Sequence, residues 1–151
     1  MDVDREIDYL IGYQYRNINE NGHVIPEYLV PCYSRMAAIA NLVALEKPTM
    51  KVIAALLRVG VLDEEEDVSR EALLGLVKID PSIAKAALVA GTYDADYQVR
   101  ATAIEELHRL APILAIDTAK RLKDDEDEMV RDYAIELLGL PYTESPRITS
   151  R

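Results

Sequence analysis

The feature that most restricts the fold of this chain is a short pattern that recurs along it. Two segments, beginning at Val99 and Val130, share a Val-Arg pair followed by Ala, Ile and Leu three, four and seven residues after the arginine. Segments at Ser34-Arg35 and Ser69-Arg70 fit the same frame with more varied side chains. The four arginines lie at positions 35, 70, 100 and 131, so the intervals are 35, 30 and 31 residues. Such a period suits a unit of two helices and two short turns.

Within each unit, apolar residues at i, i+3, i+4 and i+7 predict amphipathic helices. Asp80-Pro81 predicts a helix cap and first residue, and Gly91 predicts the end of that helix. In the same way Pro48 and Gly60 are expected to bracket a helix, Pro112 to begin one, and Gly139 before Pro141 to end the last.

The pattern therefore predicts about eight helices. One covers residues 3–15, a turn follows at residues 17–24, and the others alternate over residues 26–140. The long first interval predicts a longer connection near Lys47 or Asp63.

Composition favours the same all-α fold. The chain has 151 residues, of which half are hydrophobic, and it contains no Phe or Trp, a mix that suits closely packed helices. We expect one domain over residues 1–140, in which residues 1–25 cap the N-terminal end. Residues 141–151 contain few large apolar side chains and are expected to form a flexible tail.

Residues 96–107 and 127–138 resemble HEAT-like repeats of the phycobilin-lyase type. The resemblance is close over residues 63–140, loose over 26–60 and absent from the first 25. It implies a right-handed α-solenoid of about four HEAT-like helical hairpins. In that family the repeats serve mainly in protein recognition, and some members are chromophore lyases or DNA-binding glycosylases. A fold of this kind leaves the function open.

The recurring arginines are expected to be structural. In the family that the chain resembles, an Asp before the Val and the Arg after it pair between adjacent repeats. Partly buried pairs of this kind are costly to break. The alternative is a row of cations that bind a ligand. The residues assigned to this structural set are Arg35, Arg70, Arg100, Arg131, Asp96 and Asp127.

Two acidic runs, at residues 63–67 and 124–128, precede predicted helices, and stacking of the units would align them along one edge. The helix macrodipole accounts for one or two carboxylates per helix. Five in a row exceed that need. A solvated turn is the first interpretation, and a surface for a basic partner is the functional alternative. A calcium site is not expected, because neither run has the glycine turn and the later Glu of an EF-hand loop. The acidic residues predicted to bind a partner are Asp63, Glu64, Glu65, Glu66, Asp94, Asp124, Asp125 and Glu126.

Tyrosines form a second group of candidate binding residues. Five of the nine lie in the first 33 residues, and Tyr9 and Tyr13 share a helix face. Tyr93 and Tyr97 lie beside acidic residues. Because tyrosine is enriched at interface hot spots, these four are predicted to contact a partner. The alternative for the N-terminal group is an aromatic cover for the open end of the helix row.

The formal charge of −10 disfavours nucleic acid as a partner and favours a basic protein surface. No apolar run approaches the roughly 20 residues that span a bilayer, which excludes a membrane segment. Cys32 is the only cysteine, and Met1 is followed by charged residues rather than an apolar leader, so a cytoplasmic location is expected.

Catalytic signatures are missing from the sequence. His23 and His108 have no second ligand at metal-binding spacing, and Cys32 has no evident base nearby. We therefore expect no metal, no cofactor and no enzymatic activity. The predicted function is a protein-protein interaction scaffold, for example an immunity, inhibitor or adaptor protein, that is monomeric or weakly self-associating. The alternatives are a bilin-lyase-like chaperone, a solenoid DNA-repair-type enzyme, and a subunit that stacks on another chain.

Overall fold

A computed structural model describes residues 1–11 and 30–141, and within these ranges it contains eight α-helices and no strand. The prediction of an all-α chain is therefore confirmed. The predicted turn at residues 17–24, the helix start at Pro26 and the tail beyond 141 lie outside the described residues. The helices are α1 Val3–Ile11, α2 Cys32–Val43, α3 Met50–Leu62, α4 Glu66–Ile79, α5 Pro81–Gly91, α6 Tyr97–Leu110, α7 Pro112–Leu122 and α8 Glu128–Leu137.

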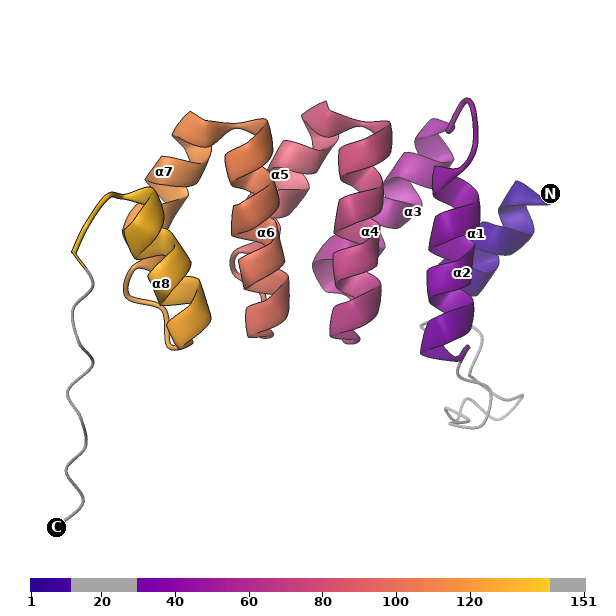
Figure 1. The fold of residues 1–151 in the computed structure, drawn as a ribbon. Helices are drawn as coiled ribbons and strands as arrows, with labels where there is room; N and C mark the ends of the chain where they lie inside the picture. The colour runs from indigo at the N-terminus through magenta and orange to yellow at the C-terminus, as the bar shows by residue number, and fades with distance from the viewer. Residues whose placement is uncertain (12–29, 142–151) are drawn as a thin grey trace, which may run out of the picture.

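The helices form two layers (Figure 1). Helices α2, α4, α6 and α8 make the first layer, in which each helix packs against the next. Helices α1, α3, α5 and α7 make the other, in which α1 packs against α3 and α3 against α5. The turns α3–α4, α5–α6 and α7–α8 lie along one edge of the molecule, and those that enter α3, α5 and α7 lie along the opposite edge.

The core lies between the two layers, and equivalent residues of the first layer fill it. Val68, Val99 and Val130 occupy the third position after the cap residue of α4, α6 and α8, and all three are fully buried. An Ala and a Leu or Ile follow four and five residues later in each helix and are also buried. Burial of one Leu, Ile or Val contributes about 1.5–3 kcal/mol, so these shared positions hold the layers together.

This alignment corrects the sequence frame by one residue in α4. Counted from the cap residues Glu65, Asp96 and Asp127, the equivalent of Arg100 and Arg131 is Ser69, not Arg70. Matching on the arginine misaligned this segment, because the buried Val68 fixes which face of α4 points inward. Arg70 instead is half-buried and donates hydrogen bonds to Gln98 and Thr102 of α6.

Helix ends agree with the sequence where the signal is local. Asp80 caps α5 by accepting from the N–H groups of Ser82 and Ile83, Pro81 is the first residue, and Gly91 is the last. Pro112 begins α7, and Gly139 follows α8 with a φ of 63°.

Gly60, however, does not end α3, which continues to Leu62. A Cβ on Gly60 would lie 3.1 Å from Leu73 Cδ2 and 3.3 Å from the Leu73 backbone nitrogen, so this glycine lets α3 and α4 approach closely. The longer connection falls at residues 44–49, near Lys47, and not at Asp63.

Candidate protein-interaction surface

Three equivalent turns, α3–α4, α5–α6 and α7–α8, contain most of the acidic residues that the sequence analysis predicted to bind a partner. We call this surface the acidic edge; it comprises residues 63–67, 92–97 and 123–128, which lie along one edge of the helix row (Figure 1). Lys123 is the only basic residue within these ranges. The acidic members are Asp63, Glu64, Glu65, Glu66, Asp67, Asp94, Asp96, Asp124, Asp125, Glu126, Asp127 and Glu128.

The three turns share one hydrogen bond. An Asp two residues before each cap residue accepts from that residue's backbone N–H. The N···O distances are 3.1 Å for Asp63, 2.8 Å for Asp94 and 2.9 Å for Asp125. Local bonds of this type are the reason that Asp is favoured in turns. These three carboxylates therefore shape the turns.

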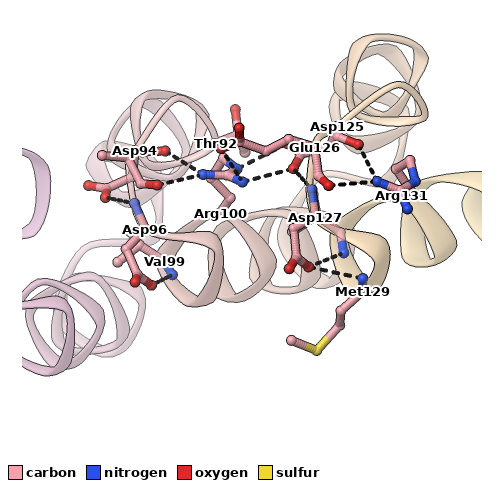
Figure 2. A network of polar contacts seen from close by, with 12 residues as sticks. Thr92, Asp94, Asp96, Val99, Arg100, Asp125, Glu126, Asp127, Met129 and Arg131 are labelled. Atoms are coloured by element: carbon pink, nitrogen blue, oxygen red, sulfur yellow. Dashed lines mark hydrogen bonds and ion pairs between the residues drawn. The ribbon is translucent and has the colours of Figure 1, made fainter.

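Asp96 and Asp127 act as helix caps. Asp96 accepts from the N–H groups of Gln98 and Val99, and Asp127 accepts from those of Met129 and Val130 (Figure 2). The resemblance to HEAT-like repeats implied that these two aspartates pair with arginine between repeats. In the structure Arg100 donates to a different carboxylate.

That acceptor is Asp125, which binds Arg100 across two turns (Figure 2). Nε and Nη2 of Arg100 donate to the two carboxylate oxygens of Asp125 at 3.0 and 2.8 Å. Nη1 donates to the backbone carbonyls of Asp94 and Ala95, both at 2.9 Å. The side chains of Arg100 and Asp125 are only 7% and 8% exposed. Arg100 thereby fixes the α7–α8 turn to the α5–α6 turn.

A similar pair lies at the N-terminal end of the row. Arg35 donates through Nη1 and Nη2 to Asp63, whose side chain is 4% exposed, and through Nε to the Leu10 carbonyl. Arg131, at the C-terminal end, donates to the carbonyls of Asp125 and Glu126, as Arg100 does in its own turn. All three arginines donate to groups within the fold, and their structural role stays a prediction.

The series is interrupted at α4. Ser69 stands where the other helices have arginine, and its hydroxyl donates to the Gly60 carbonyl at 2.8 Å. As a result Asp94, the equivalent of Asp63 and Asp125, has no bidentate guanidinium partner among the described residues. It is half-buried, and its carboxylate accepts from the Asp96 N–H.

The ion pair changes the acidity of Asp125. Burial opposes ionisation of this carboxyl, but hydrogen bonds from Arg100 and from the Asp127 N–H outweigh burial and lower its pKa below the ordinary value. The hydrogen bond to Asp125 raises the pKa of Arg100 above its ordinary value. Both partners are therefore held in their charged forms at neutral pH.

The acidic residues predicted to bind a partner therefore fall into buried or half-buried and exposed groups. Asp63 and Asp125 are turned inward to arginine, so their carboxylates do not face a partner as the sequence predicted. Glu66 and Asp94 are half-buried. The exposed members are Glu64, Glu65, Asp67, Asp124, Glu126 and Glu128, of which Glu126 is 84% exposed.

Tyr93 and Tyr97 also lie on the acidic edge. Tyr93 is 67% exposed, and the guanidinium of Arg121 stacks 3.7 Å from its ring centroid. Arg121 is held by the carbonyl and hydroxyl of Thr92, at 3.1 and 2.7 Å. The sequence singled out Tyr93 but missed Arg121 and Thr92, since nothing in the local pattern links residues 29 positions apart. Tyr97 is 38% exposed.

The N-terminal tyrosines lie elsewhere. Tyr9 is on α1, at the other end of the helix row from the α7–α8 turn, and its hydroxyl accepts from Arg5. Tyr13 lies outside the described residues. Tyr9 therefore does not extend the acidic edge into one continuous tyrosine-containing surface.

Other candidate groups have structural contacts. His108 lies 3.3 Å from the Tyr133 hydroxyl, and burial raises the pKa of the Cys32 thiol. In residues 1–11 and 30–141, no three His, Cys, Asp or Glu side chains are placed to hold a metal ion. No helix in the same ranges is both long enough and apolar enough to cross a bilayer.

Comparison of the chain with protein-family models, with curated proteins and with solved structures gives no match in any of the three.

Proposed function

We propose that this protein is a HEAT-like, right-handed helical solenoid that binds another protein and has no enzymatic activity. In this proposal the acidic edge is the binding surface, the partner presents a basic surface, and the complex forms in the cytoplasm. An inhibitor, immunity or adaptor role is consistent with it.

One observation carries the proposal: the acidic edge contains more carboxylates than its fold uses. Asp63 and Asp125 bind arginine, and Asp96 and Asp127 cap helices. Six further carboxylates at the edge are exposed. Three of them are also in ion pairs: Asp67 with Arg70, Asp124 with Lys123 and Glu126 with Arg100. Charge of one sign along a rigid edge accelerates encounter with an oppositely charged surface and rejects like-charged proteins.

Exposed tyrosine within this edge supports protein as the partner. Arg121 orders the Tyr93 side chain before binding, so less side-chain entropy is lost when a partner covers the ring. The net charge of −10 argues against nucleic acid, since affinity for phosphate backbones comes largely from protein cations.

The test compares two variants of equal charge. The edge variant changes Glu64, Asp124, Glu126 and Glu128 to the corresponding amides. It leaves the buried Arg35–Asp63 and Arg100–Asp125 pairs and the helix caps intact, and it removes the exposed charge contacts of Asp124 with Lys123 and of Glu126 with Arg100. The matched control changes four other exposed carboxylates, Glu46, Glu105, Asp132 and Glu136, in the same way. Both proteins are immobilised, and retention of extract proteins is measured at low and moderate salt by quantitative mass spectrometry.

We expect the wild type and the control to retain the same basic protein, with salt-sensitive binding, and the edge variant to retain at least tenfold less. Equal retention by the edge variant and the control would show that total charge, and not the acidic edge, is responsible.

A further inference from the structure

A second exposed surface lies on α7, and it is apolar where the turns of the acidic edge are charged. This helix has two apolar faces. Ala115, Ala119 and Leu122 are buried at i, i+4 and i+7 and pack into the core. Ile113, Leu114 and Ile116 point elsewhere and are 87%, 38% and 41% exposed. Three large aliphatic side chains left exposed on one helix turn form a patch that the fold itself does not use.

These side chains line a hollow between α5 and α7, which we call the α5–α7 groove. Its walls include Lys85 of α5, Pro112, Ile113 and Ile116 of α7, and Lys120 one turn further along α7. Helices α3 and α5 pack against each other, whereas α5 and α7 make no comparable contact. The weaker packing of α5 against α7 leaves the apolar walls open.

The side chains that line the groove have a small net positive charge, in contrast to the chain as a whole. Two lysines border it, and its one acidic residue, Asp117, is paired with Lys120 at 3.0 Å. The N-terminus of α7 also opens here. Its cap residue is Ala111, which offers no side-chain acceptor, and its first turn contains no acidic residue. Helices α5, α6 and α8 each begin at a capping Asp instead.

An uncapped helix N-terminus favours a negatively charged group, because its backbone N–H groups lack acceptors and the helix dipole is positive there. Lys85 adds charge of the same sign beside the apolar walls, whereas the charge of Lys120 is offset by Asp117. An occupant that matches this surface has an apolar stripe bordered by carboxylates.

We propose that the α5–α7 groove binds a helix of another protein, one with large aliphatic residues at i, i+3 or i+4 and i+7 and with acidic residues beside that stripe. Such a helix buries its apolar face against Ile113, Leu114 and Ile116, as amphipathic helices do in apolar grooves. Its carboxylates lie near Lys85 and the first turn of α7. This site is independent of the acidic edge, which would bind a basic surface.

The experiment measures binding of two synthetic 18-residue helices to the full-length protein by fluorescence anisotropy. Both carry the same leucine stripe; one has glutamates beside it and the other has lysines. We expect saturable binding of the glutamate helix, at least tenfold tighter than that of the lysine helix. The Ile113→Ser/Ile116→Ser variant should weaken it at least tenfold, and Lys85→Glu should reduce the preference for glutamate.

The matched control is Met50→Ser, which removes an apolar side chain of 69% exposure from α3, outside the groove. It should bind the glutamate helix as the wild type does, and so should the edge variant described above, so failure of one proposal leaves the other testable. Circular dichroism verifies that each variant is folded. Failure of both helices to bind, equal binding of both, or unaltered binding by the double serine variant would each overturn the proposal. Sedimentation showing that the groove is covered by a second copy, with dimer lost in the double variant, would also overturn it.

Discussion

The turns that precede α6 and α8 have nearly the same sequence layout but different surroundings. One contains Asp94-Ala95-Asp96 and the other Asp125-Glu126-Asp127. In both, the first Asp accepts from the N–H of the second, and the second caps the helix. Only Asp125 receives a bidentate guanidinium, because the previous first-layer helix supplies Arg100. At the corresponding position before Asp94, the chain has Ser69.

This difference shows that an acidic turn does not determine its own role. The carboxylate of Asp125 is locked between two turns, whereas that of Asp94 is half-buried without an arginine of this kind. The deciding residue lies 25 positions earlier in the sequence, on another helix. The following experiments test how far this contrast extends.

The largest expected effect is the loss of the buried ion pair. Asp125→Ala leaves the Arg100 guanidinium buried without its carboxylate, and we expect the free energy of unfolding to fall by about 3–5 kcal/mol. Asp94→Ala removes only a local turn bond and should cost about 1 kcal/mol. Urea denaturation of both variants measures the difference, with Glu128→Ala as an exposed neighbouring control. Equal losses at Asp94 and Asp125 would remove the contrast.

The second effect is a pH dependence that resides in Asp125. Because its pKa is lower in the folded chain than in the unfolded chain, ionised Asp125 stabilises the fold above the unfolded value of about 4. That stabilisation is lost as pH falls through the folded pKa. The stability gap between the wild type and Asp125→Ala should therefore narrow at acid pH, measured by denaturation at a series of pH values. A gap that stays constant between neutral and acid pH would contradict this assignment.

A smaller effect is expected at the helix caps, where the two turns should be alike. Asp96→Ala and Asp127→Ala each remove an acceptor for two backbone N–H groups and should cost about 0.5–2 kcal/mol. Glu65→Ala should cost less, since Glu65 makes no side-chain cap bond to α4. Thermal unfolding of the three variants ranks them. A loss at Glu65 as large as at Asp96 would show that charge near the helix end matters more than the bond.

The smallest expected effect concerns the residue that replaces arginine. Ser69→Ala deletes the buried hydroxyl that donates to the Gly60 carbonyl, at an expected cost of about 0.5–1.5 kcal/mol. The change in urea midpoint reports it. An unchanged midpoint would mean that water satisfies the Gly60 carbonyl as well as the hydroxyl does.

The sequence predicts the parts of this fold that local chemistry determines. Asp80, Pro81 and Gly91 mark both ends of α5 because a cap acceptor, a fixed φ and a missing side chain act within a few residues. Gly60 carries the same signal but lies inside α3, because its small size is needed for the approach of α4 and not for a helix end.

Contacts between distant residues were beyond the sequence pattern. The pairing of Arg100 with Asp125, and not with an aspartate that caps a helix, depends on how two turns lie in space. Ile113 and Ile116 look like core residues in a helical pattern, since periodicity alone does not distinguish a face that packs inward from one that stays open.

The presence of Ser69 in place of an arginine also changes how successive helices are joined. Arg35 fastens the α3–α4 turn to α1 and α2, and Arg100 fastens the α7–α8 turn to α6. Between α4 and α6 the described residues contain no equivalent arginine–aspartate pair. The hydrogen bonds of Arg70 to Gln98 and Thr102 span this junction instead. This junction is therefore joined by hydrogen bonds to neutral side chains and by the packing of α4 against α6, without a buried ion pair among the described residues.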